Sequence, residues 1–548
     1  MNSQKLARAL FGVGLAALCA LALLTSLKLV GDFQIDDAYI TFAFSKNVAL
    51  GRGAIYGYDL KVEGYSNFLW MLLISLGLKL GAGALTTARA LAHIANLTLL
   101  FSTYKAARSF TRAIPGALSV ACLAATSDLV RAAQSGLETC LYSALIATAL
   151  WAYVSENAGR RHWSMVALLL AALTRIDGFV PLFAVAGFEA IRQISSARSL
   201  SLSYLRWLAI GIVPLAIYWL WRYSYYGLPL PLPFYAKATQ TIGGASSGLG
   251  YLWNGVQDLG LWVPLLLAAL GVPRPLHQRA AVLLGFLVLG FSYVAYVGGD
   301  WMPMERMFLP LLSPLWVLAS LGLEVLWERL SRRGLAQWVC RGTALLLCVL
   351  ASRYAHEGTV DTSNEKAKIA HAAELSVHTR RLLDALPFLQ AMLRKPGERL
   401  VTDYGGVFAF GTDASVIEMW GLCNREIALH GTSQGINPIY GKTCVPCYAE
   451  FDPDYFHLVV PLLRSPAAIP NQRRAISEVF QGNAIDRYVH FKDRYRLGRV
   501  TSRRTKESFF FLEKRRTGLS YEPRSKGDYR INYIQDKLES SPSSPERN

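Results

Sequence analysis

The chain has 548 residues, of which 53% are hydrophobic and only 17% are charged, and its mean hydropathy is +0.27. Soluble globular proteins carry roughly 25% charged residues, so this composition argues against a soluble enzyme, a disordered scaffold and, with 8 cysteines, a disulfide framework. A net charge of +18 would suggest nucleic acid in a soluble chain, but basic cytoplasmic loops explain it in a membrane protein. The composition therefore predicts a polytopic membrane protein that contacts anionic lipid and has no nucleic-acid partner.

The composition of the chain changes near residue 352. Before this point, long apolar segments alternate with short polar ones; after it, charge rises and no stretch approaches the ~20 apolar residues of a membrane span. We predict a transmembrane domain over 1–351, a soluble α/β or α+β domain over 352–539, and a disordered tail over 540–548.

The predicted membrane domain contains a series of apolar segments. The first runs from Ala9 to Leu27 behind Lys5 and Arg8, and no clean cleavage site follows it, so an uncleaved span is favoured over a signal peptide. The remaining segments lie near 67–81, 85–104, 113–130, 136–154, 163–190 in two pieces, 203–221, 254–271, 279–297, 306–326 and 334–351.

Basic residues between the apolar segments predict the orientation, because cytoplasmic loops are enriched in Lys and Arg. The basic loops all fall on the cytoplasmic side only if the region 67–104 crosses the membrane once, so we predict that 67–81 is interfacial or re-entrant. This leaves about eleven spans in the cytoplasmic (inner) membrane. The N-terminus is then cytoplasmic and the soluble domain extracytoplasmic. The loops assigned to the cytoplasm carry Lys5 and Arg8, Lys105, Arg108 and Arg112, Arg160 and Arg161, Arg192 and Arg198, Arg274 and Arg279, and Arg329, Arg332 and Arg333.

This orientation places nearly every unusual polar cluster of the membrane domain on the outer face. That is where an active site is expected. The clusters are the 31–66 loop, Ser135–Thr139, Thr174–Gly178, the loop from Arg222 to Lys237, and Gly298–Arg306.

Two adjacent acids, Asp36 and Asp37, follow the first apolar segment. Apolar residues at rough helical spacing after them predict a short amphipathic helix on the membrane surface. Acidic residues commonly open helices for structural reasons. The alternative is a catalytic carboxylate at the lipid–water boundary, where partial desolvation and an adjacent like charge suit a general base. Glu63, further along the same loop beside aromatic residues, is a candidate sugar-binding position or a solvated loop residue.

Read in order, these loops resemble those of bacterial GT-C glycosyltransferases, and most closely the group that contains the mycobacterial terminal arabinofuranosyltransferase. No single motif is specific, but their shared order and spacing cover most of the chain. The matching stretches are Asp36–Thr41, Gly51-Arg52-Gly53, Glu63–Trp70, Ser135–Thr139, Thr174–Gly178, Leu230–Lys237, Gly298–Arg306 and Val416–Leu422.

The resemblance implies transfer of a sugar, arabinofuranose or a hexose, from a polyprenyl-phosphate donor to a cell-envelope glycan, with inversion. It also implies that an aspartate of the Asp36/Asp37 pair is the general base, and we place Asp37 slightly before Asp36. A flippase for a lipid-linked saccharide would instead need ionisable residues along a mid-membrane path in repeated halves. A non-catalytic component of polysaccharide assembly would tolerate replacement of both acids.

A phosphate leaving group also needs cations, because negative charge accumulates on its oxygens. Arg175, Lys237 and Arg306 each lie next to a predicted outer membrane boundary and are the candidate donor-phosphate ligands. Each of them alone could equally snorkel or pair with a neighbouring acid.

The same clusters contain further candidate substrate contacts. Glu138 suits either sugar binding or, preferentially, a structural pairing with Arg175. Tyr235 lies in an aromatic loop that fits the membrane interface as well as a ligand. Asp177 and Asp300 complete the candidate set, and with Glu138, Asp36 and Asp37 they could supply oxygen ligands for Mg²⁺ or Mn²⁺, although no spacing demands a metal.

In the soluble domain, 361–395 is predicted as a helix, and strands are predicted at Arg399–Thr402, Ser415–Met419 and His457–Pro461. Cys444 and Cys447 form a CxxC motif. On an oxidising outer face we expect a Cys444–Cys447 disulfide or a bond from either to Cys423, ahead of a zinc or redox role.

Overall fold

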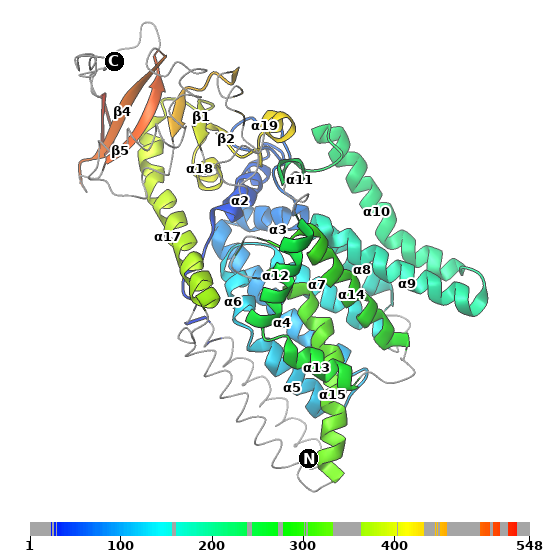
Figure 1. Ribbon diagram of the computed structural model, residues 1–548. Helices are drawn as coiled ribbons and strands as arrows, with labels where there is room; N and C mark the ends of the chain where they lie inside the picture. Colours follow the sequence, from blue (N-terminus) through cyan, green and yellow to red (C-terminus); the bar gives the residue numbers. More distant parts are fainter. Residues whose placement is uncertain are drawn as a thin grey trace, which may run out of the picture. The chain divides into compact units, whose positions relative to one another are not determined.

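The computed structural model describes a set of residues that covers most of the first 332 positions and parts of the remainder (Figure 1). The predicted first span, apart from its last residues, lies outside this set, as do the predicted segment 334–351 and the tail 540–548. The described residues are 24, 27–28, 30–155, 161–237, 244–271, 278–300, 302, 305–332, 363–402, 404–431, 444, 447, 450–457, 494–504, 508–515 and 524–533.

The chain forms two compact units that interleave along the sequence. The helical unit consists of 1–50, 65–231 and 238–377. The C-terminal unit consists of 378–548 together with two short segments from the first half of the chain, 51–64 and 232–237. Two of the predicted outer loops therefore contribute residues to the C-terminal unit.

The helical unit is built almost entirely of α-helices. Its described elements are α2 (Asp36–Ala49), α3 (Phe68–Lys79), α4 (Ala84–Ala107), α5 (Ala113–Ala124), α6 (Ser127–Gln134), α7 (Thr139–Val154), α8 (Arg161–Thr174), the 3₁₀ turn η2 (Ile176–Gly178), α9 (Phe179–Ala197), α10 (Leu202–Tyr226), α12 (Gly244–Asp258), α13 (Trp262–Gly271), α14 (Gln278–Val297), α15 (Leu309–Arg332) and the first part of α17 (Ser363–Met392).

Among the described residues, 4 helices are long and apolar enough to cross a membrane: α4, α10, α14 and α15. The predicted 113–130 segment is a bent pair, α5 and α6, with an angle of 51° between them, and it could form one further span. α3, which we expected to be interfacial or re-entrant, has 12 residues and is shorter than a span. The total of eleven spans stays a prediction.

Helix α2 confirms the short helix expected after the first apolar segment, and it begins at Asp36. The expected amphipathic pattern is wrong, because every residue from Ala38 to Ser45 is buried in the fold. It is held against the start of α3 by polar as well as apolar contacts. The Ser45 hydroxyl donates to the Met71 carbonyl at 2.9 Å, and Thr41 and Ser45 are both buried. The turn before α7 also approaches α2 closely, since a side chain at Gly136 would meet Ala38 Cβ at 3.0 Å. Gly136 has a φ of +89°, which favours glycine independently.

The C-terminal unit contains a mixed sheet with the strand order β2-β1-β3-β5-β4-β7-β6, of which Figure 1 labels the long strands β4 and β5. β1 pairs in parallel with β2 and β3, and the remaining pairs are antiparallel. The strands are β1 (Arg399–Thr402), β2 (Ser415–Glu418), β3 (Tyr455–His457), β4 (Tyr495–Ser502), β5 (Ser508–Lys514), β6 (Arg524–Lys526) and β7 (Tyr529–Tyr533), with helices α11 (Leu232–Lys237), α18 (Gly406–Gly411) and α19 (Arg425–His430).

The segment 51–64 is held in the C-terminal unit by a backbone hydrogen bond, an ion pair and a close backbone approach. Tyr58 N–H donates to the Ala414 carbonyl at 3.1 Å, and Arg52 forms an ion pair with Asp413 at 3.2 Å. Gly57, with a φ of +59°, lies so close to Ala414 that a Cβ there would meet the Ala414 oxygen at 3.0 Å. Position 57 therefore requires glycine for both conformation and space.

Burial of a histidine makes the stability of the C-terminal unit sensitive to pH. His378 is 7% exposed and packs on the Tyr404 ring, with the ring centroids 4.2 Å apart. Burial, and secondarily Arg381, lowers the pKa of His378 to about 4. Because the folded-state pKa is depressed, the neutral form is favoured in the fold. Stability is therefore complete above pH 6.5 and is lost as the pH falls toward 4.

We expect the His378→Phe variant, which keeps an aromatic ring, to lose less stability between pH 7 and pH 5 than the wild type. The full pKa shift, from 6.5 to about 4, limits the difference to about 3 kcal/mol, of which about 2 kcal/mol develops between pH 7 and pH 5. Thermal unfolding midpoints of both proteins in detergent at the two pH values measure it. Parallel midpoints for wild type and variant would contradict the assignment.

Candidate functional site

Arg175 is the centre of a buried ion-pair cluster in the helical unit. It lies between α8 and η2, and its side chain is 16% exposed. Its guanidinium donates two hydrogen bonds to the Asp177 carboxylate, from Nε to Oδ1 at 2.9 Å and from Nη2 to Oδ2 at 3.0 Å. Nη1 donates to Glu138 Oε1 at 3.2 Å. The pairing of Glu138 with Arg175, preferred from the sequence, is present in the structure.

The face of this guanidinium is also covered. Arg175 Cζ lies 5.3 Å from the centre of the Tyr142 ring, a cation–π geometry. A guanidinium carries five N–H groups, and the bonds to the two carboxylates use three of them. Among the described residues, one N–H on Nη1 and one on Nη2 therefore remain for a further oxygen ligand.

A chain of hydrogen bonds runs from this cluster to helix α2. Glu138 Oε2 accepts a bond from Asn67 Nδ2 at 3.0 Å, and Asn67 Oδ1 accepts one from Thr41 Oγ1 at 3.1 Å. Thr41 and Asn67 are each 4% exposed. Thr41 lies four residues after Asp37, so both are on one face of α2.

The two candidate bases occupy the first turn of α2 and are half-buried. The approach to that turn is fixed by Arg89 of α4, which donates to the Phe33 carbonyl at 3.0 Å and to the Gln134 carbonyl at 3.0 Å. Arg89 also pairs with Asp32. The start of α2 is therefore anchored to the loop that leads into α7.

The second candidate cation of the helical unit, Arg306, forms an ion pair with Asp300, and both side chains are largely buried. Arg306 and Arg175 line the same cavity of about 40 Å³. The Asp177 carboxylate also lines it, and the other walls are mainly apolar and come from α9, α14 and α15, including Val180, Leu289 and Leu311. The structure thus joins two guanidinium groups to an apolar cavity.

The structure assigns the remaining candidates to the C-terminal unit. Lys237 and Tyr235 lie in the short helix α11, and Glu63 lies in the segment that precedes Tyr65. These two segments contact one another: Leu232 N–H donates to the Glu63 carbonyl at 2.9 Å, and Glu63 is buried. Lys237 therefore belongs to the same unit as Glu63 and Tyr235, whereas Arg175 and Arg306 belong to the helical unit. The roles assigned to all of these residues stay predictions.

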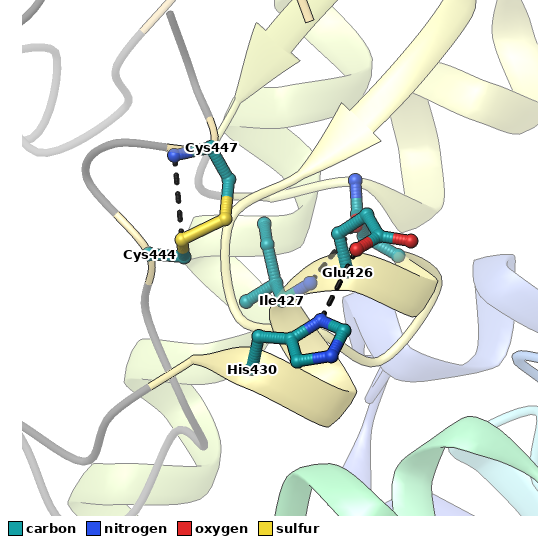
Figure 2. The surroundings of a disulfide bond; sticks show 6 residues. Glu426, Ile427, His430, Cys444 and Cys447 are labelled. Atoms are coloured by element: carbon teal, nitrogen blue, oxygen red, sulfur yellow. Dashed lines mark hydrogen bonds and ion pairs between the residues drawn. A yellow bond between two sulfur atoms is a disulfide. The ribbon is translucent and has the colours of Figure 1, made fainter. Parts of the chain in front are cut away.

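Cys444 and Cys447 are joined by a disulfide bond near α19 (Figure 2). The Cys447 N–H also points at Cys444 Sγ, 3.3 Å away. Cys423, the alternative partner considered from the sequence, is buried and forms no disulfide within the described part of the chain.

Carboxylates in the described part of the chain do not form a metal site. No group of three or more His, Cys, Asp or Glu side chains among those residues could hold a metal ion. Asp177 and Glu138 bind the Arg175 guanidinium, and Asp300 binds Arg306. A requirement for Mg²⁺ or Mn²⁺ stays untested.

Sequence reasoning did not single out Thr41, Asn67 or Tyr142 as parts of the site. Thr41 and Asn67 fell inside the motif stretches quoted above, but their side chains had no assigned role. The sequence does show Asn67 directly before an apolar helix, but an asparagine in this position is normally interpreted as a helix cap. Only the tertiary structure shows that its amide is turned to other partners.

The fold and this cluster together define a mostly helical protein with several helices long and apolar enough to cross a membrane and with buried ionisable residues at helix ends. No protein-family model matches the chain, and no curated protein matches its sequence.

Solved structures give the fold more closely. ArnT from Cupriavidus metallidurans, bound to undecaprenyl phosphate, is similar with a TM-score of 0.54 at 14% identity, over 84% of this chain and 94% of that chain. The archaeal oligosaccharyltransferase AglB from Archaeoglobus fulgidus, in complex with an inhibitory peptide and a dolichol-phosphate, is similar with a TM-score of 0.52 at 12% identity, over 93% of this chain and 75% of that chain. The GT-C-like fold expected from the loop motifs is confirmed. The nearer resemblance to the arabinofuranosyltransferase group stays a prediction.

Proposed function

We propose that this protein is a glycosyltransferase that moves a sugar from a polyprenyl-phosphate donor to a cell-envelope glycan. The observation that carries the proposal is the cavity lined by Arg175, Arg306 and apolar residues of α9, α14 and α15. Such a lining matches a ligand that has an anionic phosphate at one end and a hydrocarbon chain at the other. The two solved structures of similar fold were determined with undecaprenyl phosphate and with a dolichol-phosphate.

The two guanidinium groups of the site, those of Arg175 and Arg306, suit a phosphate that becomes more negative as it leaves. Two guanidinium groups held in a partly dry setting stabilise the leaving phosphate without reorganising at the moment of reaction. Asp177, Glu138 and Asp300 hold them in place. Three carboxylates therefore face two guanidinium groups and more than neutralise them, so binding of the phosphate depends on the N–H groups of Arg175 that these carboxylates leave and not on a net positive charge.

The remaining requirement is a base for the acceptor, and we assign it to Asp37, with Asp36 as the alternative. The acceptor hydroxyl oxygen attacks the anomeric carbon while its proton passes to the carboxylate. The bond from that carbon to the phosphate oxygen breaks, and its electron pair leaves with the phosphate. Attack opposite to the leaving group inverts the configuration.

The finer assignments rest on the loop motifs. They favour arabinofuranose or a hexose as the sugar, the outer face of the cytoplasmic membrane as the place of reaction, and an extracytoplasmic C-terminal domain. Among the residues of the C-terminal unit, Glu63 and Tyr235 are assigned to substrate binding, and Lys237 is assigned as a phosphate ligand.

The test is sugar transfer by the purified protein. Radiolabelled polyprenyl-phosphate arabinofuranose and hexoses are supplied separately with an envelope glycan extract, and label in the glycan is counted. We expect transfer from one donor class. Absence of transfer from every donor, together with passage of the sugar lipid across a proteoliposome membrane, would overturn the proposal in favour of a flippase.

A further inference from the structure

The hydrogen-bond chain between α2 and Arg175 contains two N-cap residues that do not cap their helices. Asn67 and Glu138 are the N-cap residues of α3 and α7, and neither side chain accepts a bond from its own helix. Asn is among the best capping residues, and a cap contributes about 1 kcal/mol. The fold forgoes this local stabilisation at Asn67 and uses both atoms of its amide elsewhere.

The bonds of Asn67 fix the orientation of the Glu138 carboxylate. Oε2 of Glu138 is bonded to Asn67 and Oε1 to Arg175. The terminal torsion of a glutamate is broad, so without the Asn67 bond this carboxylate can rotate. The Arg175 guanidinium would then lose one of its anchors, although its two bonds to Asp177 remain.

We propose that Thr41 and Asn67 are positioning residues that tie the helix bearing Asp36 and Asp37 to the phosphate-binding guanidinium of Arg175. This inference rests on the proposed function. Neither residue touches the donor phosphate in the proposed arrangement. The Thr41 hydroxyl fixes the orientation of the Asn67 amide, and this amide fixes the orientation of the Glu138 carboxylate. The Glu138 carboxylate in turn fixes the direction of the remaining N–H groups of Arg175. The base and the cation are thereby held as one rigid assembly.

The sharpest test replaces Thr41, the residue of the hydrogen-bond chain that is farthest from Arg175. Thr41→Val keeps the shape of the side chain and removes its donor, whereas Thr41→Ser keeps the hydroxyl. The readout is the affinity for undecaprenyl phosphate, measured on the full-length protein in detergent by native mass spectrometry. We expect Thr41→Val and Asn67→Leu to weaken binding about tenfold, which corresponds to about 1.4 kcal/mol, and Thr41→Ser to bind like the wild type.

A matched control separates positioning from general loosening of the helical unit. Thr103 is also buried, and its hydroxyl lies 2.7 Å from Ser313 Oγ, between α4 and α15, and 2.7 Å from the Leu99 carbonyl oxygen. Thr103→Val removes buried hydroxyl bonds that are not part of the Thr41–Asn67–Glu138 chain. It is expected to leave the affinity unchanged and to lower the unfolding midpoint at least as much as Thr41→Val.

Equal losses of affinity in Thr41→Val and Thr103→Val would overturn the inference, and so would wild-type affinity in both Thr41→Val and Asn67→Leu. In each case the proposed function would stand. Failure of the wild-type protein itself to bind undecaprenyl phosphate would instead remove the proposed function, and the inference with it.

Discussion

The Asp37→Asn variant is expected to transfer sugar about a thousandfold more slowly than the wild type. Asn has nearly the same shape as Asp but cannot accept the proton of the acceptor hydroxyl, and a positioned general base typically contributes a factor of about 10² to 10⁴. The initial rate of label transfer at saturating donor and acceptor measures the effect.

Asp36→Asn is the matched control, because it makes the same chemical change one residue away in the same first turn of α2. We expect it to retain more than a tenth of the wild-type rate, and both variants to bind undecaprenyl phosphate normally. A large loss in Asp36→Asn alone would move the base to Asp36. Normal transfer by both variants would exclude the pair as the base.

The second large effect is expected at Arg306. Arg306→Gln removes one of the two guanidinium groups that line the cavity, and loss of a single charge-stabilising group typically lowers kcat by about 10² to 10³. Weaker binding of undecaprenyl phosphate should accompany the loss of rate. The change also removes one side of a largely buried ion pair, so a fall in stability is expected with it.

A double variant distinguishes the two roles of Arg306. In Arg306→Gln combined with Asp300→Asn, both partners of the ion pair are neutral, so the negative charge of Asp300 is removed together with the positive charge of Arg306. If Arg306 binds the donor phosphate, the double variant recovers its unfolding midpoint but remains inactive. Recovery of transfer together with stability would show that the pair is structural and would exclude Arg306 from donor binding.

Much of the fold could be predicted from the sequence because its signals are local. The acidic start of α2 and the residues of β1 follow from runs of a few residues, and both agree with the structure. β3 begins at Tyr455, two residues before the predicted start at His457, because strand limits depend on pairing with β1 and β5; the rest of the predicted strand, 458–461, lies outside the described residues. The number of spans was harder to predict, because apolar runs such as 113–130 form bent or short helices.

The candidate site was predictable only in part, for a physical reason. Arg175 and Asp177 are two residues apart, so their pairing needs little long-range information. The assignment of Lys237 to the C-terminal unit depends on contacts of residues 232–237 with segments far away in the chain, such as Leu232 with Glu63. The role of Asn67 was hidden because its residue type has a more common use at a helix start.

The interleaving of the two units limits how this protein can be recombined. The chain passes between them at 50/51, 64/65, 231/232, 237/238 and 377/378. An exchange of the C-terminal unit between relatives at one junction would leave residues 51–64 and 232–237 facing foreign partners, including the close fit of Gly57 to Ala414. A viable chimera would need all three segments together, so they are expected to diverge in evolution as one piece although they are far apart in the gene.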